Sequence, residues 1–63
     1  MKILEFLKYL KTEHNVNFYG ENGYLFNTST RCISNLPKFF LENAEIVEIA
    51  FSDIGLTLTI KGF

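Results

Sequence analysis

Hydrophobic and polar residues alternate along this chain with periods that predict two helices and four strands. Over residues 2–13 the apolar positions follow helical spacing, and charged or polar side chains lie opposite them. The apolar stripe of this segment consists of Ile3, Phe6, Leu7 and Leu10. We expect one amphipathic helix here, with Lys8 and Lys11 near the C-terminal end of the helix dipole and Asn15 closing the helix.

Two strands are expected at residues 16–20 and 24–27, on either side of a turn at Glu21-Asn22-Gly23. Asn-Gly is typical of a two-residue hairpin loop, but that register mixes apolar and polar side chains on both faces. A three-residue loop, with Gly23 in the left-handed position of a bulge, gathers four apolar side chains on one face: Val16, Phe18, Tyr24 and Phe26. A slip of one residue would move every side chain to the other face, so the pattern favours the three-residue loop.

Residues 28–35 have the least regular pattern, and both an extension of the second strand and a surface connection fit them. After this stretch, Ser34 or Asn35 is expected to cap a short helix that has Pro37 in its first turn. The apolar side of this short helix is expected to comprise Leu36, Phe39 and Phe40.

The clearest alternation is in residues 47–60, which predict a half-buried hairpin. Its turn is Ser52-Asp53-Ile54-Gly55, in which Gly55 can adopt a positive φ. This turn predicts three apolar cross-strand pairs on one face, namely Phe51 with Leu56, Ile49 with Leu58, and Val47 with Ile60.

These elements predict a single α+β domain over residues 1–63, in the order α-β-β-α-β-β. We expect a four-stranded, mostly antiparallel sheet with one long and one short helix on one face. Seven Phe and three Tyr supply most of the area that so short a chain can bury.

Compartment and source are suggested by composition alone. The only cysteine, Cys32, excludes an intramolecular disulfide and favours a reducing cytoplasm. Charges interrupt the apolar run of the first residues, unlike a signal peptide or a membrane span. Abundant Phe, Tyr, Asn, Lys and Ile, which have AT-rich codons, favour a low-GC bacterium, or a phage or mobile element.

No constellation of chemically active side chains emerges from the sequence. His14, Cys32 and Asp53 could be arranged as a nucleophilic triad, but no glycine-flanked turn surrounds Cys32. One cysteine and one histidine are too few for a zinc site, and the four glycines mark strand turns or the tail instead of a phosphate loop. We therefore expect no catalytic residue, metal or cofactor, and not an enzyme.

Charge is distributed unevenly along a chain whose net charge is −1. Residues 1–11 hold three lysines and one glutamate, whereas residues 42–53 hold four carboxylates and no cation. Those four are Glu42, Glu45, Glu48 and Asp53. An acidic segment of this kind can steer association with a basic protein. Six basic residues dispersed over the chain argue against nucleic acid as a partner, and the first helix is needed to cover the sheet, which argues against a membrane role.

Several apolar side chains fall outside the expected core faces, and gathered together they would form an interface. They are Leu4, Tyr9, Tyr19, Leu25, Ile46, Ile54 and Phe63. By elimination, the sequence predicts a small non-enzymatic protein-binding module, an inhibitor or adaptor encoded by a phage or mobile element. The alternative is a structural homodimer. The interface residues we expect are Tyr9, Tyr19, Leu25, Glu42, Glu45, Glu48, Asp53 and Ile54.

Overall fold

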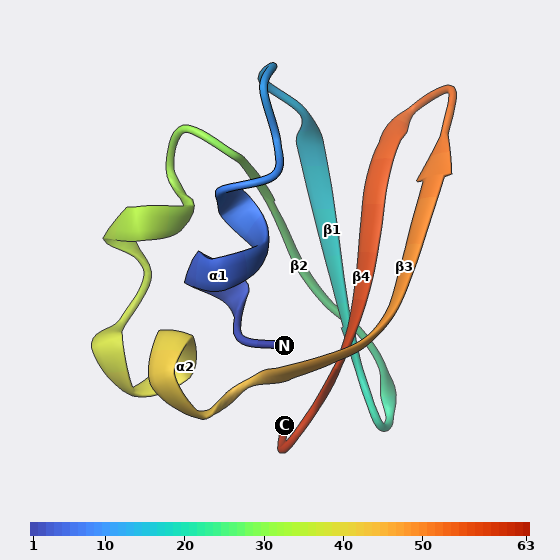
Figure 1. The fold of residues 1–63 in the computed structure, drawn as a ribbon. Coiled ribbons are helices and arrows are strands. Elements are labelled where there is room, and N and C mark those ends of the chain that lie inside the picture. Colours follow the sequence, from blue (N-terminus) through green and yellow to red (C-terminus); the bar gives the residue numbers. More distant parts are fainter.

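A computed structural model describes all of residues 1–63 as a four-stranded mixed sheet with two short helices (Figure 1). The elements in chain order are α1 Ile3–Leu7, β1 Asn15–Gly20, β2 Gly23–Ser29, a 3-10 turn η1 Ile33–Asn35, α2 Lys38–Asn43, β3 Glu45–Ser52 and β4 Gly55–Lys61. The α+β class is therefore confirmed. Neither helix is long enough, or apolar enough over its length, to cross a membrane.

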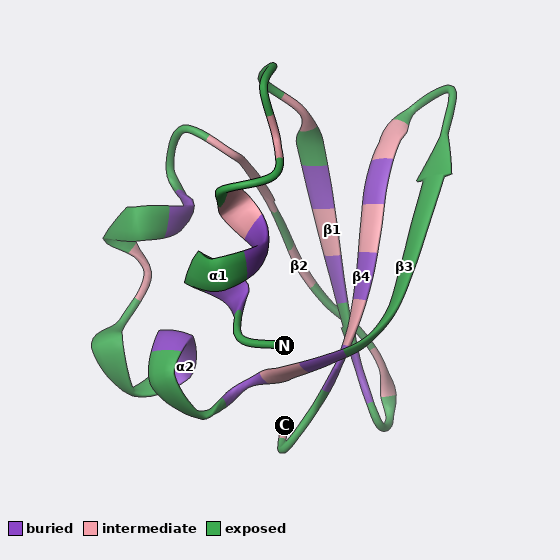
Figure 2. Cartoon of the chain, viewed as in Figure 1, coloured by how far each residue is buried: buried purple, intermediate pink, exposed green.

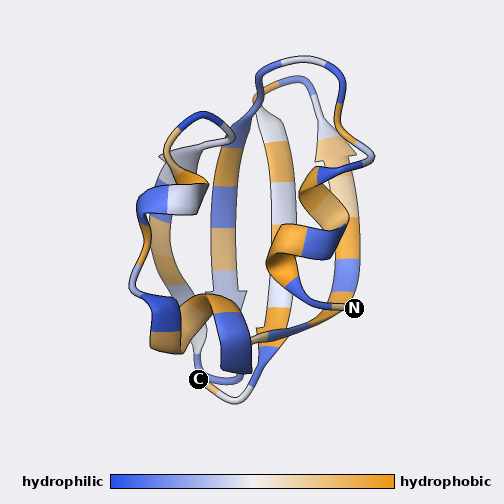
Figure 3. Ribbon diagram, turned by 60° about the vertical axis from the view of Figure 1, so that its left-hand side comes forward, coloured by the Kyte–Doolittle hydropathy of each residue, from blue (hydrophilic) through white to orange (hydrophobic).

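The sheet has the strand order β2-β1-β4-β3. Each hairpin is antiparallel, but the central strands β1 and β4 run parallel, with Val16 beside Leu56 and Phe18 beside Leu58. Both helices cover one face of the sheet: α1 lies in front of β4 and β3, and α2 in front of β1 and β2 (Figure 3). The two central strands therefore carry the most deeply buried side chains, because they have neighbours on both edges as well as helices above.

The core lies between that face and the helices. It consists of Ile3, Phe6, Val16, Phe18, Ile33, Phe40, Leu41, Ala44, Ile46, Leu56, Leu58 and Ile60. The Phe40 ring packs against three other rings, those of Phe18, Phe26 and Phe63, at centroid distances of 5.6, 5.5 and 4.9 Å. This aromatic cluster joins α2 and the C-terminus to the first hairpin, so it links segments that are distant in the sequence.

The long first helix predicted over residues 2–13 is wrong in length. The α-helix ends at Leu7, and the chain continues in tighter turns in which Tyr9 N–H donates to Phe6 O (3.0 Å) and Leu10 N–H donates to Leu7 O (3.1 Å). Leu10 still packs against the core, because apolar spacing of three residues fits these turns as well as an α-helix.

The reason for the early end of α1 lies further along the chain. His14 N–H donates to Thr30 Oγ1 and Thr30 N–H donates to His14 O, both at 3.1 Å. Residues 11–14 therefore run in non-helical conformation toward Thr30, directly after β2, and Asn15 begins β1 instead of closing a helix.

In the first hairpin, Gly23 has the predicted positive φ of 116°, and Phe18 pairs with Phe26 as predicted. The predicted three-residue loop is wrong, because Gly20 pairs with Gly23 across a two-residue turn. The extra residue lies within β2: Tyr19 pairs with Tyr24 and Phe18 with Phe26, so the register shifts at Leu25. Tyr24 is therefore paired with Tyr19, with ring centroids 5.5 Å apart, and does not share a face with Phe18 as predicted. A bulge inside the strand satisfies both the short turn and the apolar face.

The segment after β2 combines both alternatives that the sequence left open. Thr28 and Ser29 extend β2, and residues 33–35 form the turn η1. The second helix begins at Lys38, directly after Pro37, whose carbonyl accepts from Leu41 N–H at 3.1 Å. Its buried side chains are Phe40 and Leu41, whereas Phe39 is 69% exposed, so the predicted apolar side was wrong at Phe39.

The last hairpin confirms two of its three predicted apolar pairs, Phe51 with Leu56 and Ile49 with Leu58. The third is wrong, because β3 has a bulge at Val47 and Ile60 pairs with Ile46 instead. Ile46 is thereby buried in the core, and Val47 is 59% exposed.

Candidate functional site

The most exposed part of the sheet is the outer edge of β3. All six residues from Val47 to Ser52 are exposed, and β3 is green in Figure 2 from beyond its first two residues to the tip of the arrow. Only the start of this edge is covered: Ile46 N–H donates to Met1 O at 2.9 Å, and Lys2 forms an isolated antiparallel bridge with Glu45. No element pairs with the outer edge of residues 48–52, which we call the β3 edge segment.

The β3 edge segment carries apolar side chains on the face that the helices cover elsewhere. Ile49 lies opposite Leu58, and Phe51 lies opposite Leu56, and both β4 residues are fully buried. Ile49 itself is 40% exposed and Phe51 63% exposed, so this part of β3 is covered far less than the neighbouring strand β4. The Phe51 ring meets the His14 ring edge-on at 5.9 Å. An apolar strip thus borders unpaired backbone.

The acidic residues are only partly available for a partner. Glu42 pairs with Lys38 at 3.8 Å, and the Glu45 carboxylate lies 3.5 Å from Lys2 Nζ and 3.6 Å from the Met1 ammonium. Glu48 and Asp53 take part in no ion pair. Of the four carboxylates in residues 42–53, the two without an ion pair therefore lie in the β3 edge segment and in the turn that follows it.

The residues expected at an interface do not form one surface. Glu48, Asp53 and Ile54, which is 77% exposed, lie along β3 and its turn. Tyr19 and Leu25 lie in the first hairpin, each 39% exposed, Tyr9 follows α1, and Glu42 ends α2. The structure instead adds Ile49 and Phe51, which strict alternation assigned to the core. Nothing in the local pattern separates an edge strand from a central one.

The sheet face opposite the helices is mainly polar and uncharged. Here a single amide joins three strand positions: Asn27 Nδ2 donates to Asn17 Oδ1 at 2.9 Å, to Asn15 Oδ1 at 3.0 Å and to the Val16 carbonyl at 3.2 Å. Asn15 Nδ2 donates in turn to Ile54 O at 3.3 Å. This network ties the two hairpins together at the end where β1 begins.

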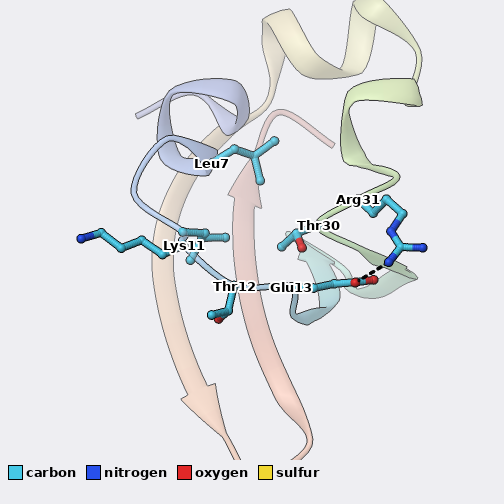
Figure 4. Close-up of a pocket in the computed structure, with 7 residues that line it drawn as sticks. Leu7, Lys11, Thr12, Glu13, Thr30 and Arg31 are labelled. Carbon is cyan, nitrogen blue, oxygen red and sulfur yellow. Dashed lines mark hydrogen bonds and ion pairs between the residues drawn. The ribbon is translucent and has the colours of Figure 1, made fainter.

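One open pocket of about 360 Å³ lies where the chain leaves α1 (Figure 4). It is lined by Leu7, Leu10, Lys11, Thr12, Glu13, Thr30 and Arg31. Across the pocket, Arg31 Nη2 donates to Glu13 Oε2 at 2.8 Å. The Arg31 guanidinium therefore already has a carboxylate partner within the pocket lining. The lining provides hydroxyl groups and opposed charges, but the Thr12 and Thr30 hydroxyls are hydrogen-bonded to His14 and no hydrogen bond joins them to Glu13.

The three residues considered for catalysis are not joined. His14 Nε2 lies 3.1 Å from Thr12 Oγ1, and no hydrogen bond links His14, Cys32 or Asp53 to one another. Cys32 is an exposed free thiol after β2, and Asp53 lies in the β3–β4 turn. No group of three or more His, Cys, Asp or Glu side chains is placed to hold a metal ion.

Comparison with known proteins adds no relative: no protein-family model, no characterised protein sequence and no solved structure matches this chain.

Proposed function

We propose that this protein is a small protein-binding module that binds through the β3 edge segment by β-sheet extension. The observation that carries the proposal is the unpaired outer edge of residues 48–52, which pair with β4 on their inner edge, beside the exposed side chains of Ile49 and Phe51. Unpaired strand edges bind added strands through main-chain hydrogen bonds, and adjacent apolar side chains increase affinity. Glu48 and Asp53 add negative charge that favours a strand without acidic residues opposite them.

The opposite edge, β2, is less suited to this role. The bulge at Leu25 interrupts its ladder near the turn, and irregular edges oppose strand addition. Phe26, which faces the helices, is partly buried against the core, so β2 offers less free apolar surface there. A substitution on β2 can therefore serve as the control for the same kind of substitution on β3.

Inhibitor and adaptor are the two roles that such a module fills most simply. They differ in their effect on the partner, since an inhibitor lowers an activity of the bound protein and an adaptor leaves it unchanged. An assay of the captured protein, with and without this chain, separates them.

The proposal is tested by mass spectrometry of proteins that co-purify with the tagged chain from its source organism. Three baits are compared: the wild type, Phe51→Lys at the β3 edge segment, and Tyr24→Lys on β2. Lysine is a residue that natural sheets use to block edge pairing. We expect a specific protein, a second copy of the chain included, with the wild type and Tyr24→Lys but not with Phe51→Lys. Equal capture by Phe51→Lys, or no specific protein at all, contradicts the proposal.

A further inference from the structure

We infer that the strand added to the β3 edge segment is the same segment of a second copy, paired antiparallel about a two-fold axis. This inference rests on the proposed function, because it needs the β3 edge to accept a strand. It specifies the occupant and the register, which the geometry of β3 restricts to one arrangement.

Symmetry limits the registers that are available. In an antiparallel pair, directly opposite residues lie on the same face of the sheet. A two-fold pairing of β3 must therefore centre on one residue, which faces its own copy. Residues equally far from that centre face each other.

Three of the candidate centres conflict with the structure. Centring on Glu48 sets two like charges directly opposite each other, which is destabilising. Centring on Ile49 extends the ladder to Ile46, whose N–H already donates to Met1 O, and across the bulge at Val47. Centring on Phe51 leaves only three residues of each strand paired before the turn begins.

Centring on Ala50 uses residues 48–52 and nothing else, which is the length of edge left free by Met1, the bulge and the turn. Ile49 of each copy then faces Phe51 of the other on the helix side. Each of these exposed apolar side chains is thereby partly buried against one from the second copy. On the polar side, Glu48 faces Ser52 of the second copy, whose hydroxyl can donate to the carboxylate. In the single chain that hydroxyl makes a long bond of 3.3 Å to Gly55 O.

The resulting assembly is one continuous sheet in which the two β3 strands meet at the middle. Because the axis is perpendicular to the sheet, the helices of both copies lie on the same face. The four side chains of Ile49 and Phe51 then lie together on the helix side of the sheet, between the helices of one copy and those of the other. In this register, apolar side chains face apolar side chains, and the Glu48 carboxylate faces the Ser52 hydroxyl. No two like charges are directly opposite each other.

The register is tested by disulfide trapping in a Cys32→Ser background, because Cys32 is exposed and would react. Ala50→Cys places the new thiol opposite its own copy, where Cβ atoms in a sheet approach to about 4.5–5.5 Å and a small shift permits a disulfide. Ser52→Cys is the matched control, because it lies on the same strand and face but opposite Glu48. We expect mild oxidation to link most of the Ala50→Cys chains and few of the Ser52→Cys chains, and a mixture of Ser52→Cys with Glu48→Cys to link. Equal or greater linking of Ser52→Cys alone overturns the inference.

The solution state is tested by sedimentation velocity over a concentration series from micromolar to millimolar. The wild type and Tyr24→Lys should shift from one chain to two, whereas Phe51→Lys should dissociate at least about tenfold more readily. Far-ultraviolet circular dichroism checks that Phe51→Lys is folded, and the trapping experiment stands independently of that variant. A wild type that stays monomeric throughout overturns the inference. If such a monomer still captures a different protein through the β3 edge segment, the proposed function survives without it.

Discussion

Gly55 lies against the main-chain carbonyl of Asn15, so close that a Cβ atom at position 55 would overlap the carbonyl oxygen. Gly55 also has a φ of 135°, which residues with a side chain rarely adopt. The β3–β4 turn is therefore held against the start of β1, and a side chain at position 55 should lower the stability of the protein.

We expect Gly55→Ala to destabilise the protein by more than Gly23→Ala. Gly23 has a similarly positive φ of 116°, but a Cβ there would meet no atom within 4 Å. Backbone strain alone costs about 1–3 kcal/mol at such positions, and only Gly55→Ala adds the overlap with Asn15. Urea denaturation of the two variants measures the difference, and equal losses would show that the contact with Asn15 contributes nothing.

Thr30 provides a second test, of the connection that ends α1 early. Thr30→Val keeps the shape of the side chain but removes the hydroxyl that accepts from His14 N–H, leaving a partly buried donor without a partner. The expected loss is about 1–3 kcal/mol in the free energy of unfolding. Thr30→Ser, which keeps the hydroxyl, should stay within about 0.5 kcal/mol of the wild type. If both variants lose the same stability, the bond is not the cause.

Phe39 and Phe40 are adjacent aromatic residues with opposite surroundings. Phe40 contacts three rings and is 8% exposed, whereas Phe39 is 69% exposed and meets only the Phe63 ring, at 5.9 Å. Phe40→Ala should cost about 3–5 kcal/mol, enough to unfold so small a domain, and Phe40→Leu should cost less. Phe39→Ala should cost under about 1 kcal/mol. Thermal unfolding followed by circular dichroism checks the order, and a larger loss at Phe39 would contradict the packing of α2.

The asparagine network predicts unequal roles for two facing residues. Asn27→Ala removes the amide that donates to three acceptors and should cost about 1–2 kcal/mol. Asn17→Ala removes one acceptor from a donor that has two others, so a smaller loss is expected. Denaturant unfolding of both variants provides the comparison, and the reverse order would contradict the assigned donor.

The hairpins were predictable from the chain because their signals are local. Alternation with a period of two, together with Gly23 and Gly55 at turns, was enough to pair Phe18 with Phe26 and Phe51 with Leu56. The apolar stripe of α1 was equally visible, since Ile3 and Phe6 are both buried. Such patterns arise because residues at fixed short spacings along the chain lie on the same face of a helix or strand.

The rest depends on contacts between segments that are far apart in the sequence. The length of α1 is limited by the bonds between His14 and Thr30, and the bulges at Leu25 and Val47 adjust each strand to its neighbour. The parallel pairing of β1 with β4 leaves β3 at the margin of the sheet. Phe51 has the alternation of a core residue, yet it is 63% exposed at that margin, whereas its partner Leu56 on β4 is fully buried. The candidate binding edge is therefore a property of strand order, and strand order results from packing between distant parts of the chain, which no local pattern encodes.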